Sequence, residues 1–168
     1  MPLQYKIIKE QLETRVIQEK TKAREDKTKS YREQIFNDEI ATQQDYITKD
    51  RKQVNSIEIC DLVDKSYNEI IHVKMGDTSY LSYVFNQATE SMKLLKDPKF
   101  KEFINEKVGF YPEKVKKVSI WLFWDIDSLS KFSKVKSMHF KVRLFEFVTV
   151  AEELGYKFEI CADFSFKK

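Results

Sequence analysis

The sequence predicts an α/β fold with a mixed central sheet of about five strands and a long N-terminal helix, in the order α, β, β, β, α, α, β, α, β. Three observations predict it. Two strand-like segments joined by a short polar turn indicate an antiparallel start to the sheet. Residues 117–125 are apolar on both faces, as is typical of a central strand covered on both sides. Helical patterns separate the later strands, which indicates crossover connections and parallel pairing.

Length and composition favour one globular domain. The chain has 168 residues, of which 42% are hydrophobic, with 13 Phe and 8 Tyr, so it can bury a core. A net charge of +3 does not by itself indicate nucleic-acid binding, so any basic surface must be local. No secretory segment opens the sequence and no apolar run reaches membrane length, so we expect a cytoplasmic protein without a membrane partner. We expect Cys60 and Cys161 to be buried free thiols in a reducing compartment rather than a disulfide.

Residues 1–44 are expected to form a charged helical extension and residues 45–168 the α/β domain. Residues 3–43 are almost all helix formers, with no Gly or Pro. Apolar residues keep a helical spacing in two patches, while residues 18–30 offer only Ala23. The patches contain Ile8, Leu12 and Val16, and Tyr31, Ile35, Phe36 and Ile40. One patch is expected to dock on the body, and the other on a second chain, which gives a possible route to self-association or partner docking.

The first strands follow this extension. Residues 45–54 are predicted to form a short strand, residues 55–63 a stronger one and residues 70–74 a third, with residues 64–68 as a turn. Gly76 then permits a sharp turn into a helix that Thr78 or Ser79 would cap.

The helix after Gly76 has a core-facing stripe at helical spacing. Its members are Leu81, Val84, Phe85, Ala88, Met92 and Leu95. Asp97-Pro98 ends this helix and starts another, which Gly109 closes. Residues 129–154 are predicted to contain a third helix with Gly155 at its end, and residues 156–164 the last strand.

Polar side chains interrupt the first hairpin where a folded chain often keeps its chemistry. If the turn centres near Ser66, Glu58 pairs across from Lys74, and Cys60 across from His72. These four side chains would then share one face of the sheet, with Asp61 on the other face unless a bulge turns it. A carboxylate, an imidazole and a lysine beside a helix N-terminus form an arrangement suited to phosphate groups.

This layout resembles the PD-(D/E)xK nuclease core of the restriction-endonuclease-like fold. That resemblance implies that Asp61 and Glu58 bind a divalent metal, Mg²⁺ or Mn²⁺, which activates water, and that Lys74 positions the nucleophile. His72 occupies the place of a second acid and is a poorer ligand for Mg²⁺ than for Mn²⁺. Gln87 resembles a glutamine found on the following helix in several nuclease branches. The alternative is a simple Glu58–Lys74 ion pair beside a half-buried His72.

Residues 45–165 resemble a sporadically distributed bacterial family of unknown function, domain family 6119, whose members often sit near restriction and phage-defence genes. Family members are generally much longer, which makes this chain resemble a C-terminal portion or a shortened relative. The resemblance implies a defence role on nucleic acid. The sequence departs from the family at Tyr83, where histidine is usual, and at Ala88, where glycine is usual. The matching positions are Glu58, Cys60, Asp61, His72, Lys74, Ser79, Leu81, Ser82, Phe85 and Gln87.

A basic segment is the second candidate for contact with nucleic acid. No acid lies between Asp127 and Glu146, so its cations can follow a phosphate backbone, or they can form an ordinary solvated face. The candidate contacts are Ser79, Ser82, Lys131, Lys134, Lys136, Lys141 and Arg143. We therefore expect a nuclease-like domain that acts on or binds DNA or RNA in phage defence, with metal-dependent endonuclease activity as the candidate reaction. The alternative is a non-catalytic protein-interaction or oligomerisation module that docks through its N-terminal helix.

Overall fold

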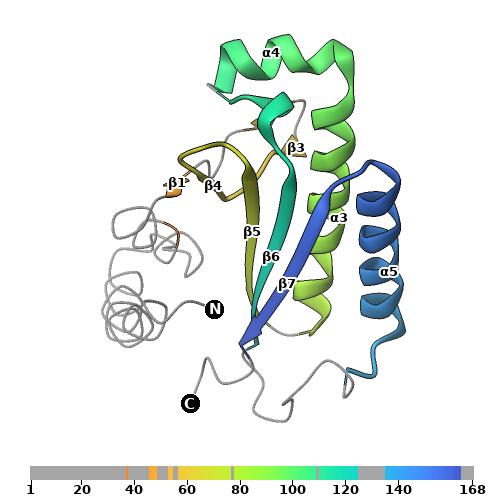
Figure 1. Ribbon diagram of the computed structural model, residues 1–168. Helices are drawn as coiled ribbons and strands as arrows, with labels where there is room; N and C mark the ends of the chain where they lie inside the picture. Colours follow the sequence, from red (N-terminus) through yellow and green to blue (C-terminus); the bar gives the residue numbers. More distant parts are fainter. Residues whose placement is uncertain are drawn as a thin grey trace.

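A computed structural model describes residues 37, 46–48, 53–54, 57–76, 78–108, 110–124 and 135–163. Four strands form the body of a mixed sheet: β4 (Leu62–Asp64), β5 (Glu69–Gly76), β6 (Lys117–Trp124) and β7 (Lys157–Asp163). The three-residue β1 (Tyr46–Thr48) pairs with the outer edge of β4, which gives the order β1-β4-β5-β6-β7 (Figure 1). β4 runs antiparallel to both β1 and β5, whereas β5, β6 and β7 run parallel to one another. The predicted mixed α/β sheet is confirmed. The predicted N-terminal helix lies, apart from Asn37, outside the described residues.

The first strands are more divided than predicted. A separate two-stranded sheet pairs β2 (Gln53–Val54) with β3 (Ile57–Glu58). Residues 55–63 were expected to form one strand, but the structure divides them between β3 in the small sheet and β4 in the large sheet. Ile59 and Cys60 are fully buried there, within the same core cluster as the long helix. Burying these two side chains favours a break in the strand over a continued ladder.

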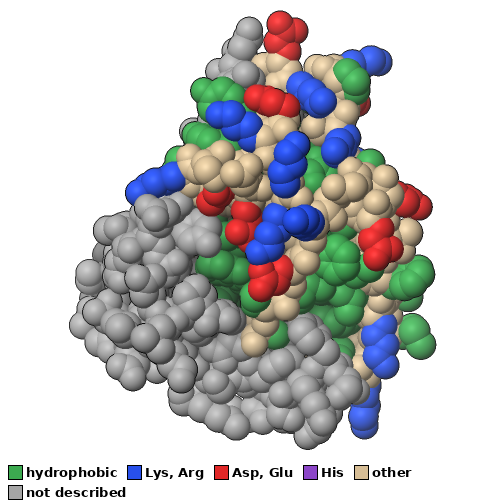
Figure 2. All heavy atoms as spheres, viewed as in Figure 1, with side chains coloured by type: hydrophobic (Ala, Val, Ile, Leu, Met, Phe, Trp, Pro, Cys, Tyr) green, Lys and Arg blue, Asp and Glu red, His purple; other side chains and the backbone are tan. Residues whose placement is uncertain are grey.

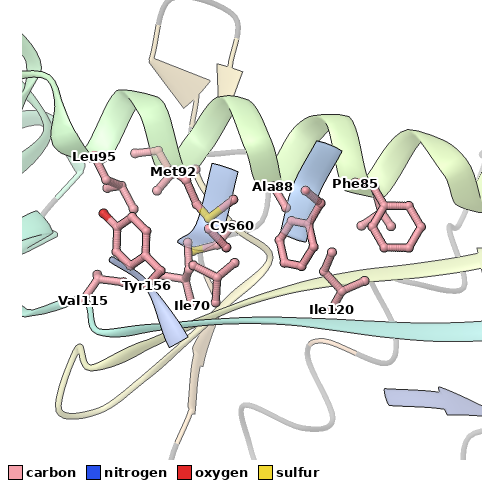
Figure 3. Packing of buried hydrophobic residues seen from close by; sticks show 14 of the residues in the cluster. Cys60, Ile70, Phe85, Ala88, Met92, Leu95, Val115, Ile120 and Tyr156 are labelled. Carbon is pink, nitrogen blue, oxygen red and sulfur yellow. The ribbon is translucent and has the colours of Figure 1, made fainter. Parts of the chain in front are cut away.

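Two helices cover one face of the sheet (Figure 1). α3 (Thr78–Lys96) and α5 (Met138–Glu153) pack against each other, and Phe85 meets Phe140 edge to face with ring centroids 5.1 Å apart. All six residues of the predicted stripe are buried, several of them against Ile70 and Ile120 of the sheet (Figure 3). α4 (Pro98–Val108) follows at Pro98, as predicted, and a 3₁₀ turn (Pro112–Lys114) leads into β6.

The ends of α5 are defined by local hydrogen bonds. Its first turn is capped by Ser137, whose hydroxyl oxygen accepts the Phe140 N–H at 3.3 Å. Gly155 has φ +73° and donates its N–H to Glu152, while the next N–H, of Tyr156, donates to Ala151. This is the Schellman arrangement, in which glycine adopts the left-handed conformation without steric cost. The predicted role of Gly155 is confirmed, and the helix predicted within residues 129–154 begins at Met138.

The opposite face of the sheet divides into a charged half and an apolar half. At the amino ends of the strands, Lys117 forms an ion pair with Glu69 at 3.0 Å and a second one with Glu159. Figure 2 shows acidic and basic side chains next to one another on this face. Toward the carboxyl ends, Val73, Met75, Trp121 and Phe123 are all buried. The predicted central strand, buried on both faces, is therefore β6.

Neither cysteine forms a disulfide, as expected, and the expected burial holds for Cys60 but not for Cys161. Cys60 lies in the core cluster on the helix-covered face, and Cys161 is half-buried on the other face, opposite Trp121 of β6. The sheet therefore separates the two thiols. Within the described part of the chain, no helix has the length and apolar character needed to cross a membrane.

Candidate functional site

The hairpin of β4 and β5 differs from the predicted register by one residue. Leu62 pairs with Ile71 and Val63 with Ile70, so a continued ladder would set Asp61, not Cys60, opposite His72. Glu58 instead pairs with Gln53 in the small sheet. The expected pairing of Glu58 with Lys74 across the hairpin is therefore wrong. Four residues, 65–68, connect Asp64 to Glu69, and no Asn-Gly signal in the sequence specifies that loop length.

Asp61 directly precedes β4, at the point where the pairing of this strand with β5 ends. Its backbone N–H donates to the carbonyl of Ile71 at 3.0 Å, and its Oδ2 accepts the N–H of Val73 at 2.7 Å. The carboxylate thus takes the place of a strand carbonyl along β5. Its Oδ1 accepts from the Asn37 side chain at 3.4 Å, and within the described part of the chain the buried Oδ1 of Asn37 has no hydrogen-bond partner. The Asn37 amide therefore contacts the Asp61 carboxylate through its nitrogen.

His72 lies deeper in the molecule than predicted. It is only 1% exposed, and its Nε2 is 3.0 Å from the hydroxyl oxygen of Ser91 on α3. The Ser91 hydroxyl donates its one proton toward the carbonyls of Gln87 and Ala88, so Nε2–H of His72 is assigned as the donor to Ser91. Burial lowers the pKa of His72 to about 3, so the imidazole is neutral at physiological pH. A buried, hydrogen-bonded imidazole does not present a ligand at the surface.

Lys74, Glu58 and Gln87 all lie on the helix-covered side of the sheet. Gln87 donates from Nε2 to Glu58 Oε2 at 3.4 Å, which joins α3 to β3, and both residues are half-buried. Lys74 follows His72 by two residues on β5, so its side chain leaves the same face, and it is half-buried. α3 runs back along β5, so the turn that contains Gln87 lies beyond Ser91 in the direction of Lys74 (Figure 1). Tyr83, one turn before Gln87, is 66% exposed.

The predicted nucleic-acid contacts are only partly brought together. Ser82 is 1% exposed, so its hydroxyl is not available to a ligand at the surface. The side chains of Ser79, Lys131 and Lys134 lie outside the described residues. Lys136 and Lys141 are exposed near the start of α5, and Arg143 forms an ion pair with Glu146 at 2.8 Å.

The side chains present set limits on a metal site. Among the described residues, no three His, Cys, Asp or Glu side chains meet as a possible metal-binding group. The candidate oxygen ligands are the Asp61 carboxylate and the buried amide oxygen of Asn37, whose nitrogen contacts that carboxylate. Mg²⁺ is commonly held by one or two carboxylates, with water and substrate phosphates as its other ligands. The donors at Asp61 fit such an ion, whereas His72 does not contribute.

Two residues of this region did not emerge from the sequence reasoning. Ser91 lies three residues after Ala88 and seven after Val84, on the apolar stripe of α3, and that position was a usable signal of a buried hydroxyl. Asn37 sits in a long charged helical pattern, and nothing in that pattern distinguishes it from its neighbours.

The sequence matches the model of a family described as "Family of unknown function (DUF6119)" over residues 4–161. The chain belongs to this family. No curated protein and no solved structure matches it. The membership agrees with the resemblance seen in the hairpin and in the helix after it. The description of DUF6119 names no reaction, so the chemistry rests on the side chains.

Proposed function

We propose that this DUF6119 chain is a nuclease-like domain that acts on nucleic acid in bacterial phage defence. The proposal rests mainly on the position of Asp61, which binds the backbone of β5 next to the strand residues His72, Val73 and Lys74. A PD-(D/E)xK nuclease core has an acid on one strand, and on the next strand it has a lysine two residues after a second metal-binding position. Three antiparallel strands followed by a helix and two parallel strands are consistent with that core.

Each residue of the site has a chemical role in this proposal. Lys74 supplies a positive charge for the scissile phosphate. Asp61, together with the Asn37 amide oxygen, would hold a divalent cation, Mg²⁺ or Mn²⁺. When bound, such an ion polarises a phosphate oxygen and lowers the pKa of its bound water. Glu58 and Gln87, which bind each other, orient the side chains near Lys74.

His72 has a structural role in the same proposal. Its neutral ring ties β5 to α3 through Ser91 and keeps Lys74 in place two residues further along the strand. The site then has fewer carboxylates than a full PD-(D/E)xK motif. We therefore expect weak cleavage that depends on a divalent cation, Mg²⁺ or Mn²⁺.

Cleavage and binding of short DNA and RNA, single- and double-stranded, test the proposal at low salt with Mn²⁺ or Mg²⁺. Lys74→Ala should lower the cleavage rate by about 10²-fold or more. Asp61→Asn should do the same while it keeps an acceptor for the Val73 N–H, so the fold is preserved. Lys101→Ala, which removes an exposed lysine on α4, is the matched control and should leave the rate unchanged.

Two results would contradict the proposal. Cleavage that survives both Lys74→Ala and Asp61→Asn would come from a contaminant or another site. A protein that neither cleaves nor binds any of these nucleic acids at low salt would favour the alternative, a non-catalytic interaction module. That alternative has one specific observation behind it, which is the outward face of α5.

A further inference from the structure

α5 has a second apolar face that points away from the sheet. Met138, Val142 and Phe145 are 71%, 46% and 72% exposed, respectively. They follow one another at spacings of four and three residues, so they form one stripe along the helix. Hydrophobic side chains protrude along this side of the molecule (Figure 2). The buried residues Phe140 and Phe147 belong to the opposite face, which packs on α3.

Such a stripe is unusual on a helix that already buries one apolar face. A surface helix of a monomer normally carries polar side chains on its outer side. Single exposed apolar residues need no explanation, but three at helical spacing match the pattern of a helix–helix contact. The inner face satisfies the packing of α5 within the chain. The outer stripe is therefore available to a further helix.

The charges beside the stripe indicate which helix fits. Lys136 and Lys141 are exposed near the first turns of α5, whereas Glu152 and Glu153 are exposed in its last turn. Lys141 lies three residues after Met138, and Glu152 seven residues after Phe145, so both border the stripe. A helix that is basic at one end and acidic at the other complements a copy of itself in the antiparallel direction.

We propose that α5 is a self-association surface, on which two copies of this chain pack antiparallel about a two-fold axis near Phe145. A two-fold axis brings the same patch of each chain together, so a self-complementary stripe satisfies it. With the axis at the level of residues 146 and 147, Lys141 faces Glu152 of the partner subunit, and Phe145 lies about 5 Å along the helix from the level of Phe145 of the partner subunit, within reach of its ring. This surface is separate from Lys74 and Asp61, so the proposal stands or falls independently of the nuclease-like function.

The expected dimer is weak. α5 contains 16 residues and is about 24 Å long at 1.5 Å per residue. One helix from each chain gives an interface at the low end of specific protein contacts, below about 1,200 Å² in total. We therefore expect a Kd on the order of 10 µM, so the chain would change from monomer to dimer between about 1 µM and about 200 µM.

Sedimentation velocity over that concentration range tests the proposal with the full chain. Phe145→Ser should raise the Kd by about tenfold or more, because aromatic residues at an interface centre dominate binding. Phe103→Ser is the matched control, since Phe103 is also a partly exposed aromatic residue, 42% exposed, but lies on α4. A chain that stays monomeric throughout, or a dimer that Phe145→Ser does not weaken, would overturn the proposal.

Charge reversal tests the antiparallel direction. Lys141→Glu and Glu152→Lys should each weaken the dimer severalfold, because each places like charges opposite one another. The double variant exchanges the two charges and should restore the dimer. Both residues are exposed, so unchanged circular dichroism would confirm that the variants fold. Failure of the double variant to restore the dimer would rule out this pairing.

Discussion

At the scale of single residues, His72 shows how a candidate catalytic side chain can have a structural role. Its sequence position, two residues before Lys74 on a strand, suggested a metal ligand. In the structure its ring is buried against Ser91, whose hydroxyl proton is used by backbone carbonyls of α3. A neutral imidazole that donates one hydrogen bond fits this position, whereas an imidazolium would place a positive charge in the desolvated core.

The buried imidazole predicts acid sensitivity. Burial lowers the pKa of His72 to about 3, below the ordinary value of about 6.5, so between these values the unfolded chain binds a proton that the folded chain does not. The contribution to stability is fully present above pH 6.5 and is lost as the pH falls, by about 2 kcal/mol at pH 5. Urea unfolding of His72→Gln should show a shallower loss of stability between pH 6.5 and pH 5 than the parent chain.

His139 provides the control for that experiment, because it is exposed on α5. His139→Gln should follow the parent chain across the same pH range. If His72→Gln and the parent lose stability with the same slope, the acid sensitivity comes from other groups, and the assignment of a neutral, buried His72 is wrong.

At the scale of elements, periodicity predicted the helices better than it predicted the hairpin. The stripe of α3 and the glycine end of α5 follow from helical spacing and from the left-handed preference of glycine. The hairpin register depends on the length of the loop between Asp64 and Glu69. This loop contains Tyr67 with φ +61°, a conformation that glycine and asparagine adopt more readily than tyrosine. A shift of one residue changes every predicted cross-strand neighbour. In the structure Glu58 pairs with Gln53 of β2 and accepts a hydrogen bond from Gln87 of α3.

The end of α5 gives a prediction at this scale. A Cβ at Gly155 would meet no atom within 4 Å, so the cost of Gly155→Ala is backbone strain at φ +73° and not a clash. We expect Gly155→Ala to lower the free energy of unfolding by about 1 kcal/mol, and Gly155→Asn to lower it less, because asparagine tolerates this conformation. Thermal and urea unfolding measure both. Equal costs for alanine and asparagine would contradict this explanation.

At the scale of the whole molecule, the sequence predicted the mixed sheet and the order of elements from the hairpin onward. Residues 117–125 identified the central strand because both of its faces are apolar, and β6 indeed lies between β5 and β7. The gathering of Asp61 with Asn37 could not be predicted, since it joins residues 24 positions apart that no local pattern connects. Long-range contacts of this kind depend on the packed fold and not on spacing.

The same layered arrangement predicts that helices and sheet unfold together. Phe85 is fully buried and contacts Phe140 and Phe147 of α5, with centroids 5.1 Å and 5.9 Å away, respectively. Phe85→Ala should lower the free energy of unfolding by about 3–5 kcal/mol, because it leaves a cavity between α3, α5 and the sheet. Phe103→Ala, on the exposed side of α4, should cost less than about 1 kcal/mol.

Two probes decide whether that loss is shared by the whole molecule. Far-ultraviolet circular dichroism follows the helices, and tryptophan fluorescence follows β6, which contains both tryptophans of the chain. Because α3 and α5 bury the helix-covered face of the strands, both urea midpoints should fall together in Phe85→Ala. A fluorescence midpoint that stays in place while the circular dichroism midpoint falls would mean that the helical layer unfolds separately from the sheet. In that case the geometry around Lys74 and Gln87 would depend on a layer less stable than the strands beneath it.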